Sequence, residues 1–275
     1  MTKNIADNET CYYCGKPATS REHAPPRSFF PDSSKLNLIT VPSCDIHNGR
    51  KSKDDEYVRA LLVMSILLHD RPDIQETKDA VERSFHRAAE RAIKKIDGKE
   101  HAGIVISRTR EFKELYGDDP LRGMITLGSL IKDEILPPSL LSTVIFDPQE
   151  ESATLPDGTP ARVCSTEIDI DRLATFFNSL ARAIYYHTNK AHYDGPVRLY
   201  MLSFFNEFIT QHEAEYRDMV APLFVKEQAY GENKDIFYYD IYNQFLQDGD
   251  VVPYGLIVNF CLYDVFKVSA LFKAR

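Results

Sequence analysis

Two short cysteine and histidine motifs near the N-terminus constrain this chain more than any other feature of its sequence. Cys11 and Cys14 are two residues apart, and Cys44 and His47 repeat the same spacing further along the chain. This spacing lets a tight turn direct both side chains of a pair at one ion, and three thiolates with one imidazole suit tetrahedral Zn²⁺. Gly15 supplies the backbone freedom that such turns use. The sequence therefore predicts one zinc ion that stabilises a small N-terminal module.

The alternative is that these side chains are ordinary buried thiols with an incidental histidine. Two equally spaced pairs argue against it, because such pairs seldom coincide by chance. Cys164 and Cys261 have no such neighbours, so we expect them to act as small apolar residues. The first twenty residues contain no apolar segment typical of a secretion signal, so we expect a cytoplasmic location, where disulfides are rare.

The segment between the two motifs indicates what kind of module this is. An acidic residue stands directly before His23, a proline follows shortly after, and an Asn-Leu pair begins at Asn37. The unit closes with Cys44-x₂-His47-Asn48-x₂-Lys51. Over residues 10–57 this pattern resembles the HNH endonuclease family, whose fold is a ββα unit around metal.

The resemblance implies a role for each matching residue. His23 would be the general base that takes a proton from the attacking water, a task that a neutral imidazole suits at neutral pH. Asn37 would orient the strand that carries His23. Glu22 and Asn48 would hold a catalytic Mg²⁺ or Mn²⁺ on the scissile phosphate. Zinc would then stabilise the scaffold, and the second metal ion would take part in the chemistry.

The remaining sequence predicts an α+β protein, with an HNH finger over residues 1–57 and a larger helix-rich α+β body over residues 58–275. Helices are expected over residues 54–70, 76–97, Ile170–Asn189 and 204–219. Strands are expected over residues 124–127, 143–146, Val197–Met201, 236–242 and 255–263. Residues 104–116 are ambiguous, and a loop near residues 147–160 offers an internal boundary.

Four basic residues recur along one face of the helix expected over residues 76–97: Arg83, Arg87, Arg91 and Lys94. One interpretation is a row of side chains that contacts nucleic-acid phosphates. The other is a solvated basic face paired with neighbouring glutamates, which is the more common situation for such runs, and we favour it.

Charge and hydropathy narrow the class of partner. The chain has 33 basic and 41 acidic residues and a net charge of −8, which argues against nonspecific coating of nucleic acid. Its apolar runs are shorter than the roughly 20 residues that cross a bilayer, so we expect no membrane span. The acidic body could instead bind a regulatory protein.

Three functions remain open at this level. The first is hydrolysis of phosphodiester bonds, with DNA the more expected substrate. The second is a noncatalytic zinc module with a protein-binding body, and the third is an RNA-directed nuclease toxin. Residues 182–190 also loosely resemble parts of other HNH-domain proteins, which implies a link to phage defence or a mobile element.

Overall fold

The computed structural model describes residues 9–35, 37–49, 51–68, 70–95, 99–116, 122–135, 149–154, 158–165, 168–204, 210–243 and 254–273. Among these residues helices account for 44% and strands for 22%, so the predicted α+β class is confirmed. The chain groups into two compact units: Met1–Ser52 together with Ala174–Arg275, and Lys53–Leu173. This grouping cuts the chain differently from the boundary expected after residue 57. The expected boundary after residue 57 says that residues 1–57 fold as a separate domain, and this stays a prediction.

The first unit begins with a short antiparallel hairpin of strands β1 (Ser20–His23) and β2 (Thr40–Ser43). Its register places Glu22 opposite Val41 and His23 opposite Thr40. Two 3₁₀ turns, η1 (Arg27–Phe29) and η2 (Asp32–Ser34), lie in the connection between the strands. Helix α1 (Ser52–Val63) follows the hairpin in the chain, so the element order is ββα.

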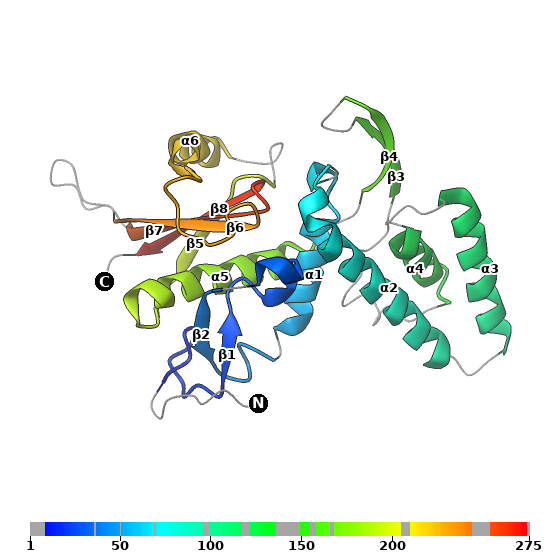
Figure 1. The fold of residues 1–275 in the computed structure, drawn as a ribbon, viewed down its shortest axis with the longest axis horizontal. Helices are drawn as coiled ribbons and strands as arrows, with labels where there is room; N and C mark the ends of the chain where they lie inside the picture. The colour runs from blue at the N-terminus through cyan, green and yellow to red at the C-terminus, as the bar shows by residue number, and fades with distance from the viewer. Residues whose placement is uncertain are drawn as a thin grey trace. The chain divides into compact units, whose positions relative to one another are not determined.

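The rest of the first unit is an antiparallel sheet with a helix on each face. Its strands are β5 (Val197–Met201), β6 (Phe237–Asn243), β7 (Tyr254–Leu262) and β8 (Phe266–Lys273), in the spatial order β5-β8-β7-β6. Helices α5 (Ile170–Asn189) and α6 (Gln211–Val220) lie on opposite sides of this sheet, with a 3₁₀ turn η6 (Ala221–Leu223) after α6 (Figure 1). The central strands β7 and β8 are buried along most of their length because both faces of the sheet are covered.

An aromatic core joins the hairpin, α5 and the sheet. The rings of Phe29 and Phe176 stack with centroids 5.2 Å apart, and Phe177 contacts Phe260 of β7 at 5.9 Å. All four side chains are buried. Residues before and after the second unit therefore share one hydrophobic core.

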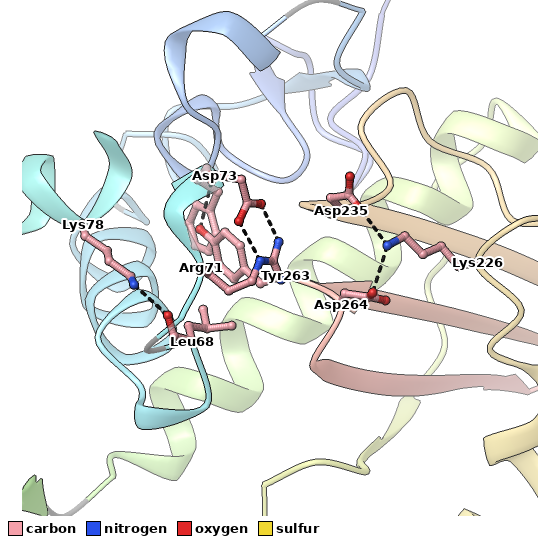
Figure 2. A network of polar contacts seen from close by, with 9 residues as sticks. Leu68, Arg71, Asp73, Lys78, Lys226, Asp235, Tyr263 and Asp264 are labelled. Atoms are coloured by element: carbon pink, nitrogen blue, oxygen red, sulfur yellow. Dashed lines mark hydrogen bonds and ion pairs between the residues drawn. The ribbon is translucent and has the colours of Figure 1, made fainter. Parts of the chain in front are cut away.

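The second unit contains α1 from Lys53 onward and a group of helices and strands. These are α2 (Gln75–Lys95), α3 (Lys99–Tyr116), α4 (Arg122–Lys132) and the antiparallel pair β3 (Gln149–Thr154) and β4 (Pro160–Ser165). Two 3₁₀ turns, η3 (Ile66–Leu68) and η4 (Pro72–Ile74), lie between α1 and α2. Figure 2 shows the Arg71–Asp73 ion pair and the hydrogen bond from Lys78 to the carbonyl of Leu68 near the start of α2.

Several expected elements agree with the structure and others do not. Helix Ile170–Asn189 and strand Val197–Met201 are confirmed, and β6 and β7 are displaced by one residue from their expected bounds. The strand expected at 124–127 is wrong, because these residues lie in α4, where Thr126 and Leu130 are buried at helical spacing. The loop expected near 147–160 contains β3, and the helix expected over 54–70 ends at Val63. The strand expected at 143–146 lies outside the described residues.

The turn between β7 and β8 holds Tyr263 in an unusual backbone conformation. Tyr263 and Asp264 have φ angles of 55° and 62°, in the left-handed region that bulky residues rarely adopt. Tyr263 is nevertheless fully buried, and its hydroxyl donates to the Phe29 carbonyl at 2.9 Å. Asp264 accepts a hydrogen bond from Lys226, which also reaches Asp235 (Figure 2). The strained turn therefore anchors the sheet to the loop that follows β1.

Tyr263→Phe is expected to lower the free energy of unfolding by about 1–3 kcal/mol, because it leaves the buried Phe29 carbonyl without its donor. The aromatic ring and the turn stay in place. Urea unfolding followed by circular dichroism measures the change. Tyr230→Phe is the matched control, since Tyr230 is exposed, and its effect should stay within about 0.5 kcal/mol. Equal stability of Tyr263→Phe and wild type would contradict the anchoring role.

Within the described residues, none of the helices combines the length and the apolar character that a membrane crossing requires.

Candidate metal centre and hairpin site

The four side chains predicted to bind zinc converge on one point. The ligand atoms of Cys11, Cys14, Cys44 and His47 all lie within 4.8 Å of one another. The Sγ atoms of Cys14 and Cys44 are 3.9 Å apart, and Nδ1 of His47 lies 3.3 Å from Sγ of Cys44 and 3.6 Å from Sγ of Cys11. A tetrahedral zinc ion separates two sulfur ligands by about 3.8 Å and a sulfur from a nitrogen by about 3.5 Å. The group could therefore hold a metal ion and is compatible with structural zinc.

Local backbone hydrogen bonds explain how the two-residue spacing brings both ligands of each motif to the same side. In the first motif the N–H of Gly15 donates to the carbonyl of Cys11, and Gly15 takes a φ of 68°. In the second motif the N–H groups of His47 and Asn48 both donate to the carbonyl of Cys44. Each motif is thus a tight turn that brings its two ligands to the same side.

The surroundings favour the metal-binding protonation states of two ligands. Burial lowers the pKa of His47, and the positive charges of Lys51, Lys16 and Arg182 lower it further. The neutral imidazole that results is the form that binds metal. Burial opposes ionisation of Cys44, but backbone N–H groups of His47 and Ile46 outweigh it and lower the pKa of this thiol. Burial raises the pKa of Cys14, which a bound metal would have to overcome.

Helix α5 contributes a side chain to this centre that the sequence did not indicate. The Tyr13 ring stacks on His47 with centroids 4.2 Å apart, and the Arg182 guanidinium lies 4.9 Å from the centroid of Tyr13. Arg182 is buried and donates to the carbonyls of Tyr193 and Gly195. The metal centre is therefore packed against α5 and the loop that follows it.

Gly15 also allows a close approach from this loop. A Cβ atom at Gly15 would lie 2.6 Å from the ring of His192, so a side chain there would force His192 to move. The ring of His192 is held at 2.6 Å from Asp194. The glycine after Cys14 is thus required by packing as well as by its left-handed backbone.

Glu22 is a buried carboxylate next to the predicted base. Its side chain is 6% exposed, and Lys51 forms an ion pair with Oε1. Among the residues that the structure describes, Oε2 of Glu22 has no hydrogen-bond partner although it is fully buried. An unpartnered buried carboxylate oxygen costs several kilocalories per mole in principle, so such an atom indicates a site for water or a cation.

Two other predicted residues lie on or against β1, the strand that carries Glu22. His23 is the last residue of β1 and is half-buried. Nδ2 of Asn48 donates to the hydroxyl of Ser20 at 2.7 Å and makes a longer contact of 3.5 Å with the carbonyl of Arg21. Asn48 therefore ties the second metal motif to β1, and its carboxamide oxygen is the atom that would bind an ion.

Asn37 lies on the exposed part of the connection before β2. Its φ of 52° is left-handed, a conformation that asparagine tolerates better than most residues. No described contact links its side chain with Glu22, His23 or Asn48. The orienting role that the family resemblance implies for Asn37 stays a prediction.

The predicted phosphate-contacting residues lie on α2 in the second unit. Arg83 and Arg87 are exposed, as either interpretation requires, and Arg91 and Lys94 follow on the same helix. Neither interpretation of this basic face is decided by the structure. Burial raises the pKa of Cys261 to about 12, so this thiol behaves as the apolar residue that the sequence predicts.

Comparisons with known proteins give no family for this chain. No protein-family model matches it, and no curated protein and no solved structure matches it. The function must therefore be argued from the site itself.

Proposed function

We propose that this protein is a metal-dependent endonuclease of the HNH type that hydrolyses phosphodiester bonds. Zinc held by Cys11, Cys14, Cys44 and His47 would stabilise the β1–β2 hairpin as the scaffold of a ββα unit. The observation that carries the proposal is the buried carboxylate of Glu22, which has one oxygen without a described partner and directly precedes His23. A scaffold that only binds zinc has no need of such a group.

Each residue at the hairpin has a defined task in this proposal. His23 accepts the proton of the attacking water and so makes it a better nucleophile. Glu22 and Asn48 supply the oxygen ligands that Mg²⁺ and Mn²⁺ prefer. When bound, the divalent ion would stabilise the negative charge that develops on the phosphate. The products are a 5′-phosphate and a 3′-hydroxyl, and DNA is the substrate that we propose.

One observation favours a second candidate function, a noncatalytic zinc scaffold. Lys51 already forms an ion pair with Glu22, and both side chains are largely buried. A structural ion pair of this kind would leave the metal centre intact without any nuclease chemistry. In that case the acidic body would be the part that binds a partner, as the charge of the chain predicts.

Glu22→Gln is expected to weaken Mn²⁺ binding severalfold or more and to reduce cleavage with it, because it removes the charged ligand and preserves its shape. Asn48→Ala should also lose activity. Supercoiled plasmid, single-stranded DNA and RNA are incubated with the purified protein, with and without Mg²⁺ or Mn²⁺. The products are then separated on gels.

The matched control is Glu227→Gln, because Glu227 is an exposed glutamate far along the chain from the hairpin. Its cleavage rate should equal that of wild type. Cleavage that is unchanged in both Glu22→Gln and Asn48→Ala would rule out this site. An inactive wild-type protein with a full zinc content would favour the scaffold function.

A further inference from the structure

We infer that Lys51 is a built-in counter-ion that a divalent cation must displace from Glu22, and that it thereby sets the metal affinity of the site. This inference rests on the proposed function and concerns the regulation of that same site. The displaced ammonium group then stays close to the ion, where it can bind the substrate phosphate.

The first support is the arrangement of the ion pair. The side chains of Lys51 and Glu22 are 10% and 6% exposed, and the ammonium contacts Oε1. Burying two charges costs more than their attraction returns in many proteins, so stability alone is weak grounds for such a pair. The second oxygen of Glu22 is buried without a described partner, so the ammonium satisfies only half of the carboxylate.

The second support is the position of Lys51 in the chain. It lies between Asn48, the other proposed ligand of the divalent ion, and Ser52, where α1 begins. The turn after Cys44 fixes the backbone on one side and the helix fixes it on the other. The flexible four-carbon side chain can therefore move while its backbone stays in place.

Electrostatic repulsion determines whether Lys51 and a divalent cation can bind the Glu22 carboxylate together or whether the cation displaces Lys51. An ammonium group and a divalent cation on the same carboxylate would lie about 5 Å apart and would repel each other strongly even at an effective dielectric constant of about 20. The divalent ion has the higher charge and gains a second ligand from Asn48. It therefore takes the carboxylate, and the ammonium leaves.

Lys51→Met is expected to bind Mn²⁺ about fivefold more tightly than wild type, because the competing charge is gone. Cleavage at saturating Mn²⁺ should fall about tenfold, because the charge that meets the phosphate is also gone. Lys51→Arg, which keeps the competing charge, should bind Mn²⁺ no more tightly than wild type. Calorimetry and Mn²⁺ electron paramagnetic resonance on the full zinc-loaded chain measure the affinity.

Lys53→Met is the matched control, since Lys53 is exposed and lies two residues further along. It should leave both Mn²⁺ affinity and cleavage unchanged. Unchanged or weaker Mn²⁺ binding by Lys51→Met would overturn the inference. Loss of zinc from Lys51→Met and also from Lys51→Gln would overturn it as well, because the pair would then be structural.

Failure of the proposed nuclease function and failure of the proposed role of Lys51 give different results. Wild-type protein that binds no Mn²⁺ and cleaves nothing refutes the proposed function together with the inference. Wild-type protein that binds Mn²⁺ and cleaves, with no gain of affinity in Lys51→Met, refutes only the role of Lys51.

Discussion

Replacing Cys44 with serine is expected to release the zinc ion and to unfold the C-terminal sheet together with the N-terminal hairpin. Cys44 is a buried ligand, and a structural zinc ion contributes about 10–16 kcal/mol in small metal-dependent modules. The stack of His47, Tyr13 and Arg182 connects the metal centre with α5, and Phe29 connects the loop after β1 with the same helix. Loss of the ion therefore removes support from the whole first unit.

Hydrogen exchange measured by mass spectrometry tests how far this unfolding extends. Peptides from β7 and β8 should lose protection in Cys44→Ser along with peptides from β1 and β2. Cys164→Ser is the control, since Cys164 lies in β4 outside the metal centre, and its zinc content should stay at about one ion per chain.

Two results would contradict this expectation. Protection retained in β7 and β8 while the hairpin exchanges freely would show that residues 1–57 fold as a separate domain, as the sequence alone predicts. Wild-type protein with far less than one zinc ion per chain would refute the metal centre itself.

The metal centre could be predicted because its geometry is local. A two-residue spacing fixes the turn, and the turn fixes where both ligands point, so Cys11, Cys14, Cys44 and His47 converge as expected. Helix α5 was predicted for a similar reason, because its apolar residues recur at helical spacing over its whole length.

The residues that the sequence did not indicate depend on long-range contacts. In the sequence, Arg182 looks like any other basic residue on an amphipathic helix. Only its packing against Tyr13 shows that it supports the metal centre. The sequence predicts that Tyr263 ends a strand. In the structure it lies in a turn with a left-handed backbone, and its hydroxyl donates a hydrogen bond to the Phe29 carbonyl. Strand β8 was missed because serine and lysine interrupt its apolar residues, and only its place between β5 and β7 in the sheet shows that it is a strand.

The same limit applies to the hairpin site. Sequence could place Glu22 next to His23, but the pairing of Glu22 with Lys51 joins residues that are distant in the chain. That pairing occupies Oε1 of Glu22 and leaves Oε2 without a described partner, which is the oxygen that the proposed divalent ion would use. Both residues belong to the sequence pattern, but the pattern does not show that they form an ion pair.

His23→Ala is expected to reduce cleavage by about 10²- to 10⁴-fold, the usual contribution of a general base. Zinc content and the helical circular dichroism signal should stay the same, because His23 lies on β1 and does not belong to the four-residue metal group. Mn²⁺ affinity should also be preserved, since Glu22 and Asn48 remain. This combination separates the base from the ligands, because Glu22→Gln is expected to lose affinity and activity together.

The measurement compares plasmid cleavage by wild type, His23→Ala and the control His187→Ala at saturating Mn²⁺. His187 is half-buried in the last turn of α5, and burial lowers its pKa, yet it lies outside the proposed site. Its removal should leave cleavage near the wild-type rate. Equal rates for His23→Ala and wild type would show that another group takes the proton. The hairpin would then act through its metal ligands alone, and Glu22 with Lys51 would be the residues to pursue.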